Sequence, residues 1–361
     1  MQTITINGRF LGQPLSGVQR FARELTLSLD RKIASGALPP ALKDAAWRLA
    51  VPRGTPVDLP LEAIAVDAFG SGPGHLWEQT ALLGRAHGGR LVGFGGSGPV
   101  AHRRQAVVIH DVTIFRHPQS FRRSYRLLHA ALGFALTRSA KIGTVSDFSR
   151  REIASVFRVP AGGIDVIYNA VDHFAALAPD TGVIERLGLR ENGYFLLVGT
   201  MKPNKNLDFA IRAFEELADP GQKLVIVGGT APSVFKPDER AQSGALVFAG
   251  RLSDAEIVAL QRQATAFVFP SLYEGFGIPP LEAMTQGCPV LAADIPAVRE
   301  ACGTAALYFD PTKRAELTDA MRRIAEDAEL RHSLIAKGRD NIGRFSWDRS
   351  ADRVLDMLAA L

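Results

Sequence analysis

Two glutamates, Glu274 and Glu282, stand on either side of a short glycine-bearing segment, residues 275–278, which reads Gly-Phe-Gly-Ile. The backbone N–H groups of such a segment can bind phosphate when a helix begins directly after it, because the helix dipole favours anions. A carboxylate does not bind phosphate, but it accepts strong hydrogen bonds from hydroxyl groups. The combination therefore suits a ligand that carries both kinds of group, such as a sugar joined to a nucleotide.

The residues around this segment predict a strand, a loop and a helix. Residues 266–269 form an apolar run typical of a buried parallel strand. Pro279 and Pro280 fit the first turn of a helix, where a missing N–H costs nothing, and this places Glu282 in the first turn. A second interpretation needs no ligand: Glu282 would only complement the helix dipole, and Glu274 would be solvated.

This stretch resembles the donor-binding signature of the retaining family-4 glycosyltransferases. The resemblance continues through residues 286–293 and 303–311 and extends over nearly the whole chain. It implies the GT-B fold, an α/β architecture with two Rossmann-like domains that face an interdomain cleft and a C-terminal helix that returns to the first domain. It also implies a metal-independent sugar transfer with retention of configuration. The sequence has no Asp-x-Asp metal motif, in agreement with the expectation that no cofactor or metal is needed.

Carried over residue by residue, the resemblance assigns roles to this stretch. Glu282 would hold the ribose hydroxyls of the donor, and Glu274, a candidate catalytic residue, would hold hydroxyls of its sugar. The N–H groups of the glycine segment would meet the sugar and the diphosphate. The donor-binding candidates of this stretch are Glu274, Gly275, Phe276, Gly277, Ile278 and Glu282.

Length and composition indicate a globular protein of two domains. The chain has 361 residues, of which 47% are hydrophobic and 22% charged. Its two cysteines give neither a disulfide framework nor a metal spacing, which favours a reduced, cytoplasmic protein. The N-terminus lacks a basic start followed by a long apolar core, so we expect no signal peptide. No apolar run approaches the roughly 18 residues of a membrane span.

Positive charge is concentrated in the N-terminal half. Residues 1–175 contain 21 Lys and Arg against 12 Asp and Glu, a net charge of +9, whereas residues 176–361 carry −4. Because there is no zinc-finger spacing and the basic residues do not interleave with aromatics, we expect no nucleic-acid partner. An anionic membrane surface is the expected partner, with the protein peripheral at the inner face of the cell membrane. Residues 121–129 mix arginine with apolar and aromatic groups, as interfacial helices do; the alternative is an ordinary surface helix with a buried apolar stripe.

A second loop that leads into a helix lies near the N-terminus. Residues 3–6 predict a strand, and residues 18–29 predict a helix with one apolar face, for which Ser16 is the expected N-cap. In the family that the sequence resembles, a glycine of this loop lets the backbone approach the donor diphosphate, and Gly17 is the match.

His110 and Asp111 follow a clear apolar strand at residues 106–109. Ligands of an open parallel sheet bind at the carboxyl ends of its strands, so this pair is a site candidate. The resemblance implies that His110 contacts the donor sugar, and that Asp111 orients the acceptor or acts as a base. Both are candidate catalytic residues. The alternative is a structural histidine that is oriented by a carboxylate.

The second half of the chain begins again with an apolar strand at residues 194–199. In the family, the loop after this strand carries a lysine that neutralises the donor diphosphate, and Lys205 is the match, both for donor binding and for catalysis. Many members have a further basic residue either directly after the glycine that ends this strand or just before the lysine, where this chain has Thr200 and Asn204. Lys202 or Arg251 could supply the missing charge.

The expected domains are residues 1–175, which would bind the acceptor, and residues 176–345, which would bind the nucleotide sugar. Residues 346–361 would form the C-terminal helix that packs back on the first domain. The motif residues, together with Asn7-Gly8-Arg9, look most like bacterial mannosyltransferases of polysaccharide assembly. GDP-mannose is therefore the preferred donor, and a lipid-linked saccharide is the expected acceptor.

Three alternatives remain open from the sequence. The first keeps the fold but uses UDP-glucose or another UDP-sugar. The second is a sugar-nucleotide epimerase or hydrolase on the same fold, which would consume the donor with no acceptor present. The third is a nicotinamide oxidoreductase, against which neither half has a G-x-G-x-x-G motif that opens a helix.

Overall fold

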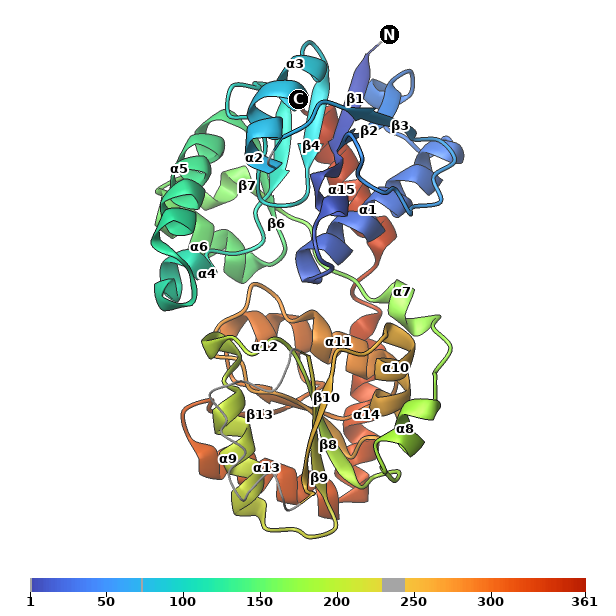
Figure 1. The fold of residues 1–361 in the computed structure, drawn as a ribbon, viewed down its shortest axis with the longest axis vertical. Coiled ribbons are helices and arrows are strands. Elements are labelled where there is room, and N and C mark those ends of the chain that lie inside the picture. Colours follow the sequence, from blue (N-terminus) through green and yellow to red (C-terminus); the bar gives the residue numbers. More distant parts are fainter. Residues whose placement is uncertain (1, 73, 229–243) are drawn as a thin grey trace. The chain divides into compact units, whose positions relative to one another are not determined.

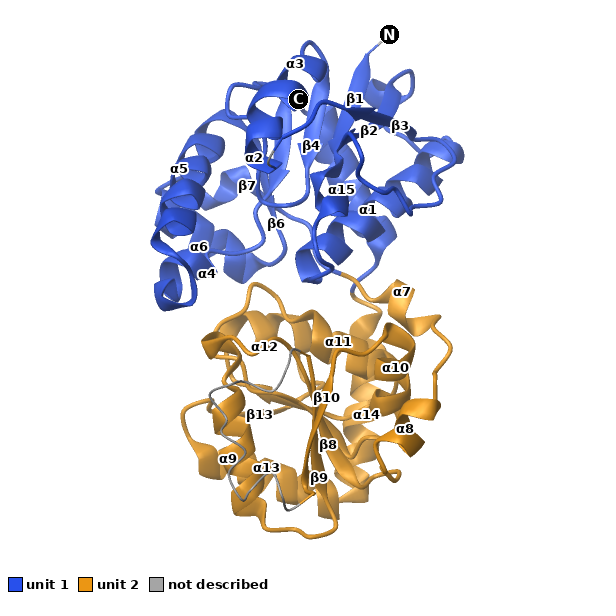
Figure 2. Cartoon of the chain, in the orientation of Figure 1, with its two compact units in different colours: residues 1–169, 345–361 blue, residues 170–344 orange. Residues whose placement is uncertain are grey.

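The chain folds into two units, each built on its own parallel sheet (Figure 1). The computed structural model describes residues 2–72, 74–228 and 244–361. Unit 1 comprises residues 1–169 and 345–361, and unit 2 comprises residues 170–344 (Figure 2). The helix α7 (Asp172–Ala175) therefore belongs to unit 2 and not to the first domain, where the expected boundary had placed it. The reason is packing: α7 contacts α11, and the Gln286 side chain donates to the carbonyl of Phe174.

Unit 1 has a seven-stranded sheet in the order β3-β2-β1-β4-β5-β6-β7, with all strands parallel. Such a sheet is buried on both faces, which explains the apolar runs in its strands. Its strands are β1 (Thr3–Asn7), β2 (Ala46–Pro52), β3 (Ala65–Phe69), β4 (Arg90–Gly93), β5 (Gln105–Val108), β6 (Lys141–Thr144) and β7 (Ile164–Val166). Its helices are α1 (Gly17–Ala34), α2 (Gly74–Trp77), α3 (Leu83–Arg85), α4 (Thr113–Arg116), α5 (Arg123–Ser139), α6 (Asp147–Phe157) and α15 (Trp347–Ala359).

Among its described residues, unit 2 has a six-stranded parallel sheet in the order β10-β9-β8-β11-β12-β13. On its core, α9 packs against α13, and α11 packs against α14. The strands are β8 (Tyr194–Val198), β9 (Lys223–Val227), β10 (Leu246–Gly250), β11 (Ala266–Phe269), β12 (Val290–Ala293) and β13 (Leu307–Phe309). The remaining helices are α8 (Gly182–Arg186), α9 (Leu207–Leu217), α10 (Asp254–Gln263), α11 (Ile278–Thr285), α12 (Pro296–Cys302), α13 (Arg314–Glu326) and α14 (Ala328–Ile342).

The strand order of each sheet contains one reversal. In unit 1 the chain reverses its direction across the sheet between β1 and β4, and in unit 2 it does so between β8 and β11. In open α/β sheets, ligands bind outside the carboxyl ends of the strands at such a switch point. The loops after β1 and β4, and those after β8 and β11, are therefore the places to look for chemistry.

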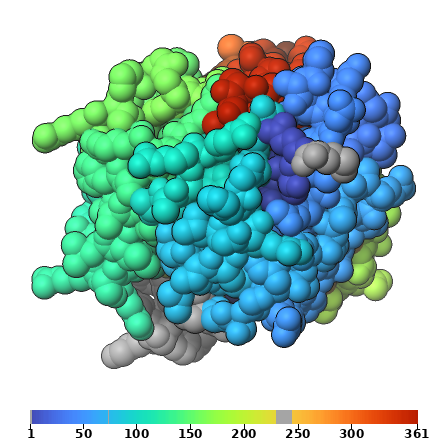
Figure 3. Space-filling model, turned by 90° about the horizontal axis from the view of Figure 1, so that it is seen from above, coloured from blue at the N-terminus to red at the C-terminus, as the bar shows by residue number. Residues whose placement is uncertain are grey.

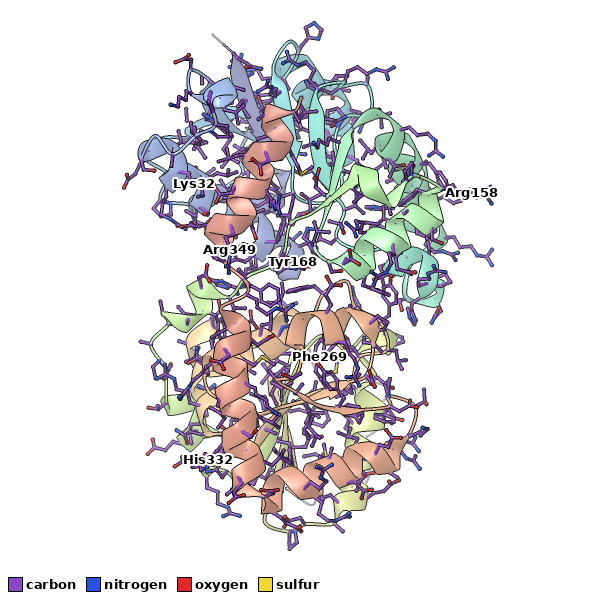
Figure 4. All side chains as sticks on the ribbon, turned by 180° about the vertical axis from the view of Figure 1, so that it is seen from behind. Lys32, Arg158, Tyr168, Phe269, His332 and Arg349 are labelled. Atoms are coloured by element: carbon purple, nitrogen blue, oxygen red, sulfur yellow. The ribbon has the colours of Figure 1, made fainter. Side chains whose placement is uncertain are left out.

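The C-terminal helix α15 packs on α1 within unit 1. Ser28 Oγ lies 2.6 Å from Asp348 Oδ1, and Lys32 Nζ lies 2.7 Å from Asp352 Oδ1, with Lys32 visible beside the helix in Figure 4. In the space-filling view the red end of the chain lies against earlier segments of unit 1 (Figure 3). Within the described parts of the chain, no helix combines the length and apolar character needed to cross a membrane.

Candidate active site

The loops that follow β8 and β11 are joined to each other by hydrogen bonds. Because β8 and β11 are neighbouring parallel strands, their carboxyl ends lie at the same edge of the unit 2 sheet. There the N–H of Leu272 donates to the carbonyl of Asn204 at 2.8 Å, and the Asn204 side chain donates to the carbonyl of Tyr273 at 3.3 Å. The two loops thus hold each other in register, one carrying Lys205 and the other Glu274.

Lys205 and Glu274 form an ion pair at this edge. Lys205 Nζ lies 2.5 Å from Glu274 Oε1 and 5.7 Å from the centroid of the Phe269 ring. The first contact is a charge-assisted hydrogen bond, and the second is a cation–π interaction. Both side chains stay accessible in part, with 23% of the lysine and 15% of the glutamate exposed. The pair therefore offers, in one place, an ammonium group for phosphate and a carboxylate for hydroxyl groups.

The backbone between Glu274 and α11 turns sharply at Gly277. Its φ of +113° lies in the left-handed region, which glycine adopts without the steric cost of a Cβ. Gly277 occupies the N-cap position of α11, and Pro279 and Pro280 lie in the first turn, as expected. The first N–H groups of a helix have no partner within the helix, so the start of α11 suits an anionic ligand.

The prediction that Glu282 lies in the first turn of this helix is wrong. α11 begins at Ile278, so Glu282 is its fifth residue and lies in the second turn. The reason is that Gly277 already serves as the N-cap, which starts the helix before the two prolines. Because the helix dipole acts within the first turn, this position weakens the interpretation that Glu282 merely complements the dipole.

Replacing Gly277 with alanine is expected to destabilise unit 2 by about 1–3 kcal/mol, the cost of a strained backbone at positive φ. Space is not the obstacle, because an added Cβ would lie 3.5 Å from Val298 Cγ2 and 3.7 Å from Phe269 Cε1, which are ordinary contacts. Urea unfolding measures the change. Gly162→Ala is the matched control, since that glycine is exposed and a Cβ there would meet nothing within 4 Å. Equal unfolding midpoints for the two variants would contradict the expectation.

The other residues suggested for the donor lie near neighbouring strand ends. Thr200 and Lys202 follow β8 and are exposed, and Arg251, which is also exposed, follows β10. Since β9 lies between β8 and β10, and strands are about 4.8 Å apart, the Arg251 backbone is about 10 Å from the end of β8. Thr200 therefore shares the loop of Lys205, whereas Arg251 lies on a different loop, two strands away from the end of β8.

Two buried polar atoms in these loops are further functional candidates. The sequence analysis considered Asn204 only as the place of a missing basic residue, and it did not consider Ser271. Among the described residues, Asn204 Oδ1 and Ser271 Oγ have no hydrogen-bond partner. A buried polar atom without a partner carries a desolvation cost, which a bound ligand can relieve. The available signal was position: Asn204 directly precedes Lys205, and Ser271 follows the end of β11.

In unit 1, His110 is held in one orientation by a backbone carbonyl. Its Nε2 lies 2.8 Å from the carbonyl oxygen of Phe94, and its ring packs edge-on against Phe21, with 4.7 Å between ring centroids. Burial lowers the pKa of His110 and outweighs the opposing effects of the Phe94 carbonyl and of Asp111. A neutral imidazole that donates from Nε2 keeps Nδ1 as an acceptor for a hydroxyl group. The alternative of a histidine oriented by a carboxylate is wrong about the orienting group, which is the Phe94 carbonyl.

Asp111 and Gly17 lie at the ends of elements in unit 1. Asp111 Oδ1 accepts a hydrogen bond from the N–H of Thr113 at 2.7 Å, so one of its two carboxylate oxygens stabilises the local loop backbone. Gly17 is exposed and is the first residue of α1, which starts one residue earlier than expected. Ser16 occupies the N-cap position as predicted, but its hydroxyl contacts the Gln19 side chain and does not cap the backbone.

Sequence reasoning also missed a fully buried carboxylate, Glu78, near the β1/β4 edge. Asn7 ends β1 and Ser97 follows β4, and both donate to Glu78 Oε1 at 2.7 Å. Arg9 Nε donates to the same oxygen at 3.0 Å, and His75 Nδ1 lies 3.0 Å from the other. Burial alone would raise the pKa of Glu78, but the hydrogen bonds and the charge of Arg9 together hold it below its usual range.

His129 of α5 extends this cluster. Its ring centroid lies 5.2 Å from that of His75 and 4.0 Å from that of Tyr125. Burial, followed by the positive charges of His75 and Arg9 and opposed by Glu78, lowers the pKa of His129 from 6.5 to about 4. The unfolded chain therefore binds more protons than the folded protein between these values. Stability is thus expected to be fully present above pH 6.5 and to fall as the pH decreases toward 4.

Urea unfolding at about pH 7.5 and about pH 5 tests this pH dependence. His129→Asn removes the titrating group, so we expect its unfolding midpoint to fall less between the two conditions than that of the wild type. His87→Asn, at an exposed position of the same unit, is the control and should behave like the wild type. An identical pH dependence in the wild type and in His129→Asn would show that His129 is not responsible.

Comparisons with known proteins find similar sequences among glycosyltransferases. Residues 184–341 match the family described as "Glycosyl transferases group 1", and all of them lie in unit 2. The O-antigen chain mannosyltransferase B of Escherichia coli is 30% identical over 264 residues, which are 70% of this chain and 69% of that protein. The O-antigen chain mannosyltransferase RfbU of Salmonella typhimurium is 29% identical over 262 residues, 71% of this chain and 70% of that protein.

Solved structures of glycosyltransferases share the fold. WaaG, a glycosyltransferase involved in lipopolysaccharide biosynthesis, superimposes with a TM-score of 0.73 at 18% identity, covering 99% of both chains. Anabaena HepE, solved in complex with UDP-glucose, gives a TM-score of 0.72 at 17% identity over the full length of both chains. The predicted GT-B fold and the resemblance found in the sequence are both confirmed. The chain belongs to the group 1 glycosyl transferases.

Proposed function

We propose that this glycosyltransferase is a retaining mannosyltransferase that takes mannose from GDP-mannose and passes it to a lipid-linked saccharide in bacterial polysaccharide assembly. The names of the two relatives support mannose and a role in O-antigen synthesis. The observation that carries the proposal is the Lys205–Glu274 pair at the β8/β11 switch point, directly before the start of α11. Phosphate-binding and hydroxyl-binding groups meet there, as a nucleotide sugar requires.

Unit 2 binds the donor in this proposal. The diphosphate draws the Lys205 ammonium group away from Glu274 and meets the first N–H groups of α11. Glu274, released from the lysine, accepts hydrogen bonds from hydroxyls of the sugar, and Glu282 accepts those of the ribose. As the glycosidic bond breaks, negative charge grows on the leaving diphosphate, and Lys205 stabilises it. Such preorganised electrostatic stabilisation is usually the largest single term in catalysis.

Unit 1 binds the acceptor and contributes to the sugar site. Nδ1 of His110 accepts a hydrogen bond from a sugar hydroxyl, and Asp111 orients the acceptor hydroxyl through the oxygen that Thr113 leaves free. Gly17 offers backbone N–H groups at the start of α1 to the diphosphate. The acceptor attacks on the face from which the diphosphate departs, and the leaving phosphate takes its proton, so configuration is retained without a covalent enzyme intermediate.

A UDP-sugar donor is the second candidate, because Anabaena HepE, which shares the fold, was solved with UDP-glucose. A thermal-shift and calorimetry panel of GDP-mannose, GDP, UDP-glucose, UDP-N-acetylglucosamine, UDP and NADH separates the candidates. A ligand that binds only the folded protein at 100 times its Kd adds about 2.7 kcal/mol of stability. We expect GDP and GDP-mannose alone to raise the Tm. A UDP-sugar response would replace GDP-mannose as donor, and no nucleotide response would overturn the proposal.

Glu274→Ala is expected to abolish turnover, because it removes both the partner that positions Lys205 and the acceptor for the hydroxyls of the donor sugar. Release of GDP from GDP-mannose, in the presence of membrane extract as the source of acceptor, measures this. Glu216→Ala, which breaks a surface ion pair with Arg314 in the same unit, is the control and should keep wild-type turnover. Wild-type rates from Glu274→Ala would exclude it from the reaction. GDP release without any acceptor would favour an epimerase or hydrolase.

A further inference from the structure

Two asparagines, Asn204 and Asn206, flank Lys205 in the loop between β8 and α9. Each of them donates a side-chain hydrogen bond to the backbone carbonyl of a different neighbouring loop. Asn204 Nδ2 lies 3.3 Å from the carbonyl oxygen of Tyr273, and Asn206 Nδ2 lies 2.9 Å from that of Pro311. The backbone on both sides of Lys205 is therefore bonded to segments far away in the chain.

Asn204 connects the loop of Lys205 to the residue before Glu274. Asn204 directly precedes Lys205 and Tyr273 directly precedes Glu274, so this hydrogen bond joins the neighbours of both members of the ion pair. The Asn204 side chain is buried, and among the described residues its Oδ1 has no partner, so its nitrogen alone makes the contact. A buried, uncharged amide brings no positive charge to a diphosphate. What Asn204 contributes to the site through this contact is the position of its neighbours.

Asn206 connects the other side of Lys205 to the start of α13. Its φ of +56° lies in the left-handed region, which asparagine tolerates better than most residues, and it occupies the N-cap position of α9. An asparagine at an N-cap commonly accepts a hydrogen bond from the first turn of its helix. This side chain makes no such bond and instead reaches Pro311, three residues before α13. Because α9 packs against α13 (Figure 1), the contact fixes the loop relative to both helices.

We propose that Asn204 and Asn206 are positioning residues for the sugar transfer, because they fix the backbone from which Lys205 reaches the leaving diphosphate. When the diphosphate draws the ammonium group away from Glu274, the side chain of Lys205 moves while its Cα stays in place. A misplacement of about 1 Å can cost about 100-fold in rate, so the position of this Cα affects catalysis. The inference rests on the proposed function and deepens it, since it assigns two further residues to the site that stabilises the leaving group.

A purely structural role of the two asparagines is the competing explanation. In that case, loss of either hydrogen bond would lower the stability of unit 2 and would leave the turnover of the folded protein unchanged. The two explanations also differ in how an asparagine substitution combines with Lys205→Ala. A residue that acts through Lys205 has no further effect once the lysine is gone, so the two substitutions are not additive.

The test is the measurement of kcat and KM for GDP release from GDP-mannose, with membrane extract as the source of acceptor, in full-length Asn204→Ala and Asn206→Gly. Glycine keeps the left-handed conformation at position 206 and removes only the side chain. We expect kcat to fall about 10–100-fold in each variant while the KM for the donor changes little, because the positioned lysine acts on charge that develops in the transition state. In the Lys205→Ala background, the same substitutions should leave kcat unchanged.

Asn192→Gly and Asn341→Ala are matched controls in unit 2. Asn192 is exposed with a φ of +53°, and among the described residues only its backbone is hydrogen-bonded. Asn341 of α14 is buried and donates to the carbonyl of Ala301 at 2.9 Å, near the end of α12. We expect Asn341→Ala to lower the Tm, and we expect both controls to keep the wild-type kcat.

Three outcomes would overturn the positioning role. These are a wild-type kcat in either asparagine variant, the same fold-loss with and without Lys205, and an equal loss of kcat in Asn192→Gly or Asn341→Ala. If Lys205→Ala is impaired and the asparagine variants are not, the proposed function stands and only the positioning role is wrong. If the wild type turns over none of the nucleotide sugars in the thermal-shift panel, the proposed function fails and the inference fails with it. A donor other than GDP-mannose would change the substrate that is used in the test and not its expected outcome.

Discussion

Replacing Lys205 with alanine is expected to lower kcat about 10²–10³-fold, the effect of removing one preorganised group that stabilises developing charge. Its ammonium group is held 2.5 Å from Glu274 and 5.7 Å from the Phe269 ring, so it already lies at the β8/β11 edge before the donor binds and moves only from Glu274 to the diphosphate. The fold should tolerate the change, because Glu274 is partly exposed and can be solvated. Release of GDP from GDP-mannose with saturating donor and membrane extract as the source of acceptor is the measurement.

The control for Lys205 is Lys313→Ala, a change of the same type at an exposed surface ion pair with Asp310 and Glu316 in the same unit. We expect it to keep wild-type turnover. Lys205→Arg should retain part of the activity, because it keeps the charge but not the position of the single ammonium group. A Lys205→Ala variant that turns over at the wild-type rate would mean that the diphosphate is stabilised elsewhere.

Replacing Glu78 with alanine is expected to destabilise unit 1 by about 3–5 kcal/mol, the usual cost of removing one partner from a buried ion pair. Glu78 is fully buried and accepts hydrogen bonds from Asn7, Arg9 and Ser97. Only 12% of the Arg9 side chain is exposed to solvent. Without the carboxylate, its guanidinium group would therefore stay largely buried and would lose its counter-charge. For a domain of this size the Tm of unit 1 should fall by about 6–20 °C.

Calorimetric unfolding measures the Glu78 effect, with Glu62→Ala at an exposed position of unit 1 as the control. The stability of the wild type should also decrease as the pH is lowered. Because the folded-state pKa of Glu78 is lowered, its stabilising contribution is present above the unfolded-state pKa and is lost as the pH falls through the folded value. An unchanged Tm in Glu78→Ala would contradict the role of this network.

Much of the fold could be predicted because buried parallel strands leave continuous apolar runs. The apolar run that predicted a strand at residues 106–109 corresponds to β5, and that at residues 194–199 corresponds to β8. The glycine and proline residues at positions 277, 279 and 280 predicted the start of α11 to within one residue. The error in the position of Glu282 came from treating the prolines as the first helical residues, although the helix starts at Ile278.

Less of the candidate site could be predicted from the sequence, because the contacts between its residues depend on the order of the strands in the sheet. Lys205 and Glu274 are far apart in the chain and meet only because β8 and β11 are neighbours. Glu78 reaches Asn7 and Arg9 through the packing of α2 and the following π-helical turn, Glu78–Leu82, at the end of β1. No spacing in the sequence predicts the contacts between these residues, although all of them lie near the switch point of a sheet, where ligands of α/β proteins bind.

Calorimetric titration of GDP-mannose into the wild type and into Glu282→Ala tests whether the β8/β11 edge binds a guanosine nucleotide sugar. A hydrogen bond to a charged group contributes about 1.5–3 kcal/mol, so removing the carboxylate that holds the ribose should weaken binding about 10–150-fold. We expect this loss of affinity in Glu282→Ala and wild-type affinity in Glu326→Ala, a control at an exposed position of α13. Equal GDP-mannose affinity in the wild type and in Glu282→Ala would contradict this expectation.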